Sequence, residues 1–273
     1  MSDTMYNIEA YNDKSTCHVD EDVPTQSEYI VYGASCYGRK ICSHDVLQAT
    51  TDRHPATRSN RKPIRISVWN VRTLFRKGQL NNVLREMERL DISVLGLCEV
   101  RWKEAGMFRK NDSTMIYSGG NEHQRGVGMI LNKQTSKSLL GHWALSDRVI
   151  LVKIKGNPFN ISIIQVYAPT SDADDDEIDG FNETLDKAYS QCKSTEDKIV
   201  MGDINAKVGK GKVGSIVGPF GLRDQNDRGQ KSIDWCARNH QVITGTWFKH
   251  HPRRLYTAKH IPVRIVVATI IQL

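Results

Sequence analysis

The stretch that decides the fold is KIVMGDINAKVG, residues 198–209. Its first four residues are expected to form a short buried strand, and Asp203 follows almost directly. The earlier stretch DISVLGLCEVRW, residues 91–102, has the same form, because an apolar run leads to Glu99. Functional side chains are often carried on the loops that follow rigid strands. Both stretches therefore predict a buried strand with a functional group at its end.

Working outward, the rest of the chain alternates between helical and extended patterns. Apolar residues recur at helical spacing over residues 79–90, whereas residues 66–69 alternate like a strand. The pattern predicts strands over residues 66–69, 92–97, 115–117, 126–131, 149–154, 160–167, 198–201 and 241–248, and helices over 79–90, 174–192 and 229–239. There is no regular parallel βαβ rhythm, which favours an α/β sandwich: two mixed sheets face to face, with helices outside.

The chain divides into three segments by composition. Residues 1–63 are first acidic and polar, then basic, without a sustained apolar period, and are predicted to be a disordered leader. Residues 64–257 carry the α/β pattern. Residues 258–273 form a divergent apolar tail of strong β character.

Bulk composition limits the class of partner. The 273 residues carry a net charge of +7, with a pI of about 9.0, which favours a polyanion such as DNA. The N-terminus lacks the pattern of a signal peptide, and the six cysteines are irregularly spaced, as in intracellular proteins with reduced thiols. No apolar run reaches the ~18 residues that span a bilayer. We expect an intracellular protein, nuclear or cytoplasmic, that is not secreted, has no membrane contact and offers no inferable protein partner.

Polar side chains end four of the predicted strands, at Asn70, at Glu99, at Tyr167, and at Asp203 with Asn205. If these ends converge, they form a cluster of carboxylates, amides and a phenol. Oxygen ligands of this kind suit Mg²⁺ or Mn²⁺, which can polarise a phosphodiester. Taken singly, each is also an ordinary turn residue or a packed aromatic.

A Gly-rich loop with three lysines follows the last of these strand ends. Lys207, Lys210 and Lys212 lie just beyond Asp203 and Asn205. The loop either follows a DNA backbone or is a solvated surface.

Seven stretches in order resemble the endonuclease/exonuclease/phosphatase superfamily, and within it the endonucleases of non-LTR retrotransposons. They are SVWNVRTL, DISVLGLCEVRW, RGVGMIL, SDRVILVKI, QVYAPTSD, KIVMGDINAKVG and NDRGQKSIDWC. The resemblance implies a four-layer αββα sandwich and a Mg²⁺-dependent endonuclease that nicks DNA.

The resemblance also implies roles for individual residues. Glu99 would be the direct metal ligand, with Asn70 in the same metal region. Tyr167 would contact the scissile phosphate, and Asp203 would orient or activate the attacking water. Asn205 would help to hold the phosphate. Arg148, in the SDRVILVKI stretch, would support the site or a contact with the DNA backbone.

The resemblance fails at Ala258. The superfamily continues with an Asp-bearing strand and a Ser-Asp-His motif, whereas this sequence has neither, and no Asp or Glu follows Asp234. We therefore expect a fold that is incomplete at the C-terminal end and a catalytically impaired domain. The alternatives are a non-catalytic nucleic-acid-binding or interaction protein and, third, a phosphatase. The phosphatase is disfavoured because Ala206 and Lys207 replace the Arg that follows Gly-Asp-x-Asn in inositol phosphatases.

Overall fold

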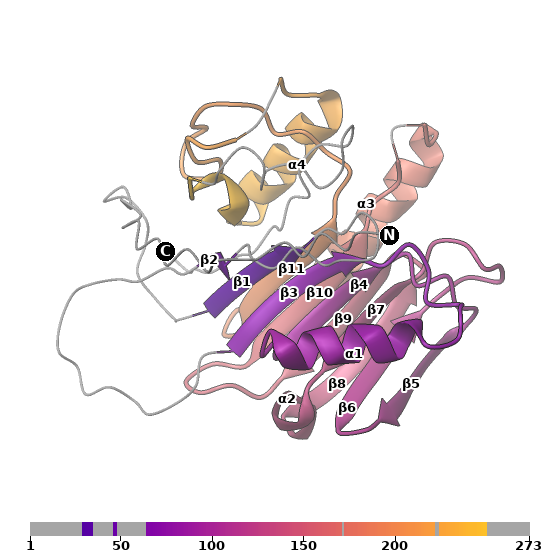
Figure 1. Ribbon diagram of the computed structural model, residues 1–273. Coiled ribbons are helices and arrows are strands. Elements are labelled where there is room, and N and C mark those ends of the chain that lie inside the picture. Colours follow the sequence, from indigo (N-terminus) through magenta and orange to yellow (C-terminus); the bar gives the residue numbers. More distant parts are fainter. Residues whose placement is uncertain (1–28, 35–45, 48–63, 171, 222–223, 250–273) are drawn as a thin grey trace, which may run out of the picture.

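The computed structural model describes residues 29–34, 46–47, 64–170, 172–221 and 224–249, which fold into two β-sheets with helices on their outer faces (Figure 1). The first sheet consists of β1 (Tyr29–Ala34), β2 (Val46–Leu47), β3 (Ile64–Asn70), β4 (Val94–Cys98), β5 (Ala105–Lys110), β6 (Ser113–Ser118) and β7 (Val127–Leu131). The second consists of β8 (Leu139–Ser146), β9 (Val149–Ile154), β10 (Ile161–Tyr167) and β11 (Asp197–Asp203). The helices are α1 (Gln79–Arg89), α2 (Lys133–Lys137), α3 (Asp175–Ser190), α4 (Asp227–Arg238) and the 3₁₀ turn η1 (Thr244–Thr246).

Both sheets are mixed. The first has the order β2-β1-β3-β4-β7-β6-β5, in which β1, β3 and β4 run parallel and the strands after β4 run antiparallel. The second has the order β11-β10-β9-β8, in which only β10 and β11 are parallel. Each sheet thus contains neighbouring parallel strands whose carboxyl ends meet at one edge.

The two sheets face each other across a predominantly apolar layer. β4 and β7 are buried along their whole length, as expected of strands covered on both faces. Val68 and Met129 of the first sheet pack in one cluster with Val152 and Ile163 of the second. This layer is the central core of the molecule.

Helices cover the outer faces. The apolar side of α1 buries Val83 and Met87 against Leu95 and Ile130, so α1 lies across the first sheet, as Figure 1 shows. α3 and α4 belong to a third cluster with β9, β10 and β11, on the opposite face of the second sheet. The layers run α, β, β, α, which confirms the predicted four-layer sandwich with two mixed sheets.

The structure differs from the predictions of local structure at several places. Residues 241–248, predicted to be a strand, contain the 3₁₀ turn η1, and Ile243 makes only an isolated bridge to Val217. Strands β5 and β8 were not predicted, since the alternately exposed residues of β5 form no apolar run. Two short strands, β1 and β2, lie within the segment expected to be disordered, and β1 pairs with β3. The tail over residues 258–273 lies outside the described residues.

In the part of the chain described here, no helix is both long and apolar enough to cross a bilayer.

Candidate active site

Four of the predicted site residues lie at the carboxyl ends of paired parallel strands. In the first sheet, Asn70 is the last residue of β3 and pairs with Cys98, directly before Glu99. In the second sheet, Tyr167 of β10 pairs with Asp203 of β11. Because the paired strands run parallel, Asn70 and Glu99 lie at the same edge of the first sheet, and Tyr167 and Asp203 lie at the same edge of the second.

Asn70 joins the two sheets at this edge. Its Nδ2 donates to Glu99 Oε1 at 2.6 Å and to Asp203 Oδ2 at 3.4 Å, although Asp203 is 133 residues away in sequence. Its Oδ1 accepts from the backbone N–H of Arg72 at 3.0 Å, which orients the amide. Asn70 and Asp203 are 6% and 8% exposed, so the shared contact lies in a largely dehydrated setting.

The backbone around the two carboxylates has unusual conformations. Gly202 has a φ of 147°, and a Cβ there would lie 1.9 Å from Val166 O, so only glycine lets β11 approach β10 before Asp203. Glu99 has a φ of 58°, in the left-handed region that non-glycine residues adopt infrequently. Strained positions of this kind are typical of functional sites.

The phenol of Tyr167 is affected by the negative charges of Glu99 and Asp203. Burial, followed by the negative charges of Glu99 and Asp203, raises the pKa of its phenol to about 12. The phenol is therefore protonated at neutral pH and can donate a hydrogen bond.

The donor set fits a hard divalent cation. Two carboxylates that share one amide donor supply the oxygen ligands that Mg²⁺ and Mn²⁺ prefer. Among the described residues, no group of three or more His, Cys, Asp or Glu converges.

Comparison with known proteins shows the family of this chain. Residues 67–257, more than half of the chain, match the Endonuclease/Exonuclease/phosphatase family. The chain belongs to that family. It is also 39% identical over 193 residues to craniofacial development protein 2 of Bos taurus, and 38% identical to that of Tragulus javanicus. The match covers 70% of this chain and 32–33% of those relatives, so the chain spans about a third of their length.

Solved structures of the endonuclease/exonuclease/phosphatase fold are also similar. The AP endonuclease LMAP from Leishmania major is 13% identical, with a TM-score of 0.49 over 74% of this chain and 76% of that one. The endonuclease domain of TRAS1, a telomere-specific non-LTR retrotransposon, is 14% identical, with a TM-score of 0.45 over 66% and 73%.

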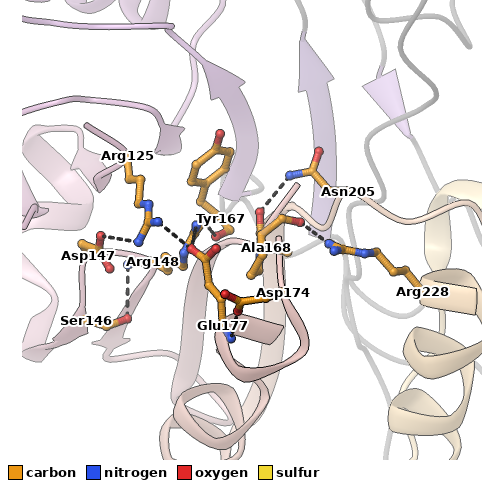
Figure 2. A network of polar contacts seen from close by, with 11 residues as sticks. Arg125, Ser146, Asp147, Arg148, Tyr167, Ala168, Asp174, Glu177, Asn205 and Arg228 are labelled. Carbon is orange, nitrogen blue, oxygen red and sulfur yellow. Dashed lines mark hydrogen bonds and ion pairs between the residues drawn. The ribbon is translucent and has the colours of Figure 1, made fainter. Parts of the chain in front are cut away.

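Arg148 contacts both the backbone carbonyl and the ring of Tyr167 (Figure 2). Its Nη1 donates to Tyr167 O at 3.0 Å, and its guanidinium lies 5.4 Å from the centre of the Tyr167 ring. Its Nη2 is paired with Glu177 at 2.5 Å, in the first turn of α3. Only 8% of the surface of Arg148 is exposed, and its guanidinium is taken up by these contacts with Tyr167 and Glu177.

The other two predicted residues lie beside this centre. Asn205 has a φ of 50°, and its Nδ2 donates to Ala168 O at 2.8 Å, which fastens the loop after β11 to the end of β10. Lys207 is tied through its backbone to Asn226, the N-cap of α4. These contacts place the backbone of Lys207 at the N-terminus of α4.

Two arginines at the site, Arg101 and Arg125, were not predicted, nor were the carboxylates that pair with Arg125. Arg101 pairs with Glu99 Oε2 at 2.9 Å. Arg125 pairs with Glu177 at 2.7 Å and lies 3.7 Å from Asp147, so that Glu177 holds two arginines together (Figure 2). Sequence alone offered one weak signal, the recurrence of Arg within the matched stretches; the pairings depend on how the loops fold.

Backbone strain gathers in the loops around the site. Among the residues that the structure describes, ten non-glycine residues have positive φ values, and seven of them lie in these loops. The seven are Arg72, Thr73, Glu99, Arg101, Glu104, Arg125 and Asn205.

Proposed function

We propose that this chain carries a Mg²⁺- or Mn²⁺-dependent phosphodiester hydrolase site of the endonuclease type, with DNA as its substrate. The observation that carries the proposal is the contact of Asn70 with both Glu99 and Asp203, because it joins the two sheets into one acidic centre. The net charge of +7 supports a polyanionic substrate.

Glu99, with Asn70 beside it, would hold the metal. Enzymes of this family generally use divalent metals. When bound, the ion would polarise the phosphodiester and stabilise the leaving oxygen.

The remaining residues would handle the phosphate and the proton. The protonated Tyr167 phenol would donate to a non-bridging phosphate oxygen. Asp203 would accept a proton from water as the new O–P bond forms and the P–O bond to the leaving strand breaks. Asn205 would help to hold the phosphate, Arg148 would keep Tyr167 in place, and Lys207 would contact the DNA backbone.

We further propose that the domain spans residues 64–257, between a leader over 1–63 and a divergent tail over 258–273, and that it is of retrotransposon origin. The seven matching stretches support both points. From Ala258 on, residues 258–273 depart from the Asp-bearing strand that the resemblance implies at this point. Loss of one catalytic acid or base costs about 10²–10⁴ in rate, so we propose that this chain turns over slowly.

The same observation favours a second function, metal-dependent binding of nucleic acid without turnover. The contacts of Asn70 with Glu99 and Asp203 support this second function, because a metal and a phosphate could be held there without proton transfer. The two functions differ in whether a DNA strand is cut.

A nicking assay separates them. Purified protein is incubated with supercoiled plasmid and Mg²⁺, alongside Glu99→Ala, Asp203→Ala and the control Asp112→Ala. Asp112 is an exposed carboxylate on the turn between β5 and β6, paired with Lys133. DNA binding is measured on the same samples, with and without Mg²⁺, and folding by circular dichroism.

Each outcome has a distinct meaning. Nicking by wild type and Asp112→Ala that both site variants lose would establish the hydrolase. Mg²⁺-dependent binding that Glu99→Ala weakens, without nicking, would establish the binding function. Folded wild-type protein that neither nicks nor binds DNA would overturn both.

A further inference from the structure

An exposed aromatic pair lies on the loops that carry the active site. The Phe75 and His123 rings have centroids 4.5 Å apart, at an interplanar angle of 58°. Phe75 is 63% exposed, more than any other large hydrophobic residue in the described part of the chain. Its neighbour Leu74 is 4% exposed and packs into the core, so the loop buries one apolar side chain and presents the next to solvent.

Three loops fix the pair in place, over residues 71–78, 99–104 and 121–126; we call them the three-loop surface. Leu74 N donates to Val100 O at 3.0 Å, and Arg101 N donates to Arg125 O at 2.9 Å. His123 Nδ1 lies 3.0 Å from Arg101 O, a hydrogen bond that requires the proton on Nδ1. The aromatic pair is thus held on a hydrogen-bonded backbone rather than on a free loop.

The three-loop surface adjoins the acidic centre. Its first and second loops begin directly after Asn70 and at Glu99, the two residues proposed to hold the metal. The second loop also supplies Arg101, whose side chain pairs with Glu99 and whose carbonyl holds His123. A nucleotide near the scissile phosphate would therefore lie within reach of the aromatic pair.

The charge of this surface suits a nucleic acid backbone. It carries six Lys or Arg against three Glu. The cations are Arg72, Arg76, Lys77, Arg101, Lys103 and Arg125, and the anions are Glu99, Glu104 and Glu122. Arg76 and Lys77 follow Phe75 directly and are exposed. Exposed aromatic rings within a positively charged surface are the combination that binds unpaired nucleotides, since every base has a face that can stack.

We propose that Phe75 and His123 form a stacking platform for an unpaired nucleobase beside the scissile phosphate. This inference rests on the proposed function, because it assumes that nucleic acid occupies the acidic centre. The platform makes the protein prefer DNA with a gap, a frayed end or an extruded base over a fully paired duplex. A paired duplex offers this surface only its phosphates, whereas an unpaired base also offers a π-face.

Binding measured by fluorescence anisotropy tests the platform without requiring turnover. The full chain is titrated with a labelled duplex and with the same duplex containing a short single-stranded gap, at fixed salt, in one series with Mg²⁺ and in a second with a chelator, and failure to bind means failure in both series. The variants are Phe75→Ala, His123→Ala, the ring-preserving Phe75→Trp and the control Phe159→Ala. Phe159 is also an exposed phenylalanine (43%), but it lies on the turn between β9 and β10.

Base stacking predicts a selective loss. Phe75→Ala should weaken binding of the gapped probe by about five- to a hundredfold. Binding of the paired duplex should change by less than about twofold, because phosphate contacts dominate there. His123→Ala should have a smaller effect in the same direction, while Phe75→Trp and Phe159→Ala should bind like wild type.

Other outcomes overturn the idea in distinguishable ways. Wild type that binds both probes equally, or Phe75→Ala that weakens both equally or neither, would sink the platform and leave the proposed function intact. Wild type that binds neither probe would overturn the proposed nucleic-acid function and the platform with it. Circular dichroism of Phe75→Ala shows whether weaker binding of the probe reflects unfolding. Binding that is weak in Phe75→Ala and normal in Phe75→Trp excludes unfolding as the cause.

Discussion

At Glu99, both carboxylate oxygens already have partners. Oε1 accepts from Asn70, and Oε2 is paired with Arg101. A divalent cation at Glu99 would meet the positive charge of Arg101, so this guanidinium would compete with the proposed metal. Arg101 is therefore a residue at which the affinity of the proposed site for a metal would be tuned.

Arg101→Gln should tighten Mg²⁺ binding. The pair is partly exposed and screened by water, so we expect an increase in affinity of about two- to fivefold. Isothermal titration calorimetry with Mg²⁺ measures it, with Arg109→Gln, an exposed arginine of β5, as the control for net charge. Unchanged or weaker binding by Arg101→Gln would show that the guanidinium organises Glu99 more than it opposes the ion.

Tyr167 reports on the same charges. Burial and, after it, the charges of Glu99 and Asp203 together raise the pKa of its phenol to about 12. Glu99→Gln removes one of these charges and should lower the pKa of Tyr167. A spectrophotometric titration of phenolate absorbance, corrected with Tyr167→Phe, measures the shift; a pKa that stays unchanged would mean that Glu99 does not act on the phenol.

At the scale of elements, the packing of the two sheets depends on Gly96 of β4, which has no side chain. A Cβ at Gly96 would lie 1.9 Å from Gln165 Oε1 and 2.8 Å from Met201 Cε. Gln165 is fully buried, and its Nε2 lies 3.2 Å from Cys98 Sγ in the adjacent sheet. Gly96 thus lets a polar side chain of β10 fit into an otherwise apolar core directly below the active site.

Gly96→Ala should lower the free energy of unfolding by about 1–3 kcal/mol, the usual cost of overpacking a core. The matched control is Gly180→Ala in α3, where a Cβ would meet nothing within 4 Å. That change should be stabilising by about 0.4–1 kcal/mol, because alanine restricts the unfolded chain. Urea unfolding gives both values, and equal effects of the two substitutions would contradict this account of β4.

At the scale of the whole molecule, several buried acids are held in their neutral form. Burial raises the pKa of Tyr189 and of Cys236 to about 12, as it does for Tyr167. Their usual values are 10.0 for tyrosine and 9.0 for cysteine, so in the unfolded chain these groups lose protons at lower pH than in the fold. Deprotonation therefore favours the unfolded state.

The free energy of unfolding should consequently be steady at neutral pH and fall as the pH rises from about 9 towards 12. The measurement is the urea midpoint across this range, and Cys236→Ala serves as the comparison, since it removes one contributor and should flatten the decline. A midpoint that is constant to pH ~11, or that declines equally in the variant, would contradict the role of these buried groups.

Sequence determined much of the local structure. Residues 79–90, 174–192 and 229–239 were predicted to be helices and correspond to α1, α3 and α4 within two residues, because their apolar spacing is a local property. The four polar strand ends were also visible, since each follows an apolar run. The strand predicted over residues 241–248 was wrong, because a short apolar run can equally pack as an irregular segment.

Only the tertiary structure decided which of these groups meet. Asn70 and Asp203 touch because two separate sheets pack with their strand ends at the same edge, a long-range result that no local pattern contains. Arg101, Arg125 and the Phe75–His123 pair were missed for a related reason. Their directions depend on loops in left-handed conformations that are held by hydrogen bonds between distant segments. Local periodicity specifies how each element forms, whereas the packing of the sheets and the backbone of the loops specify the site.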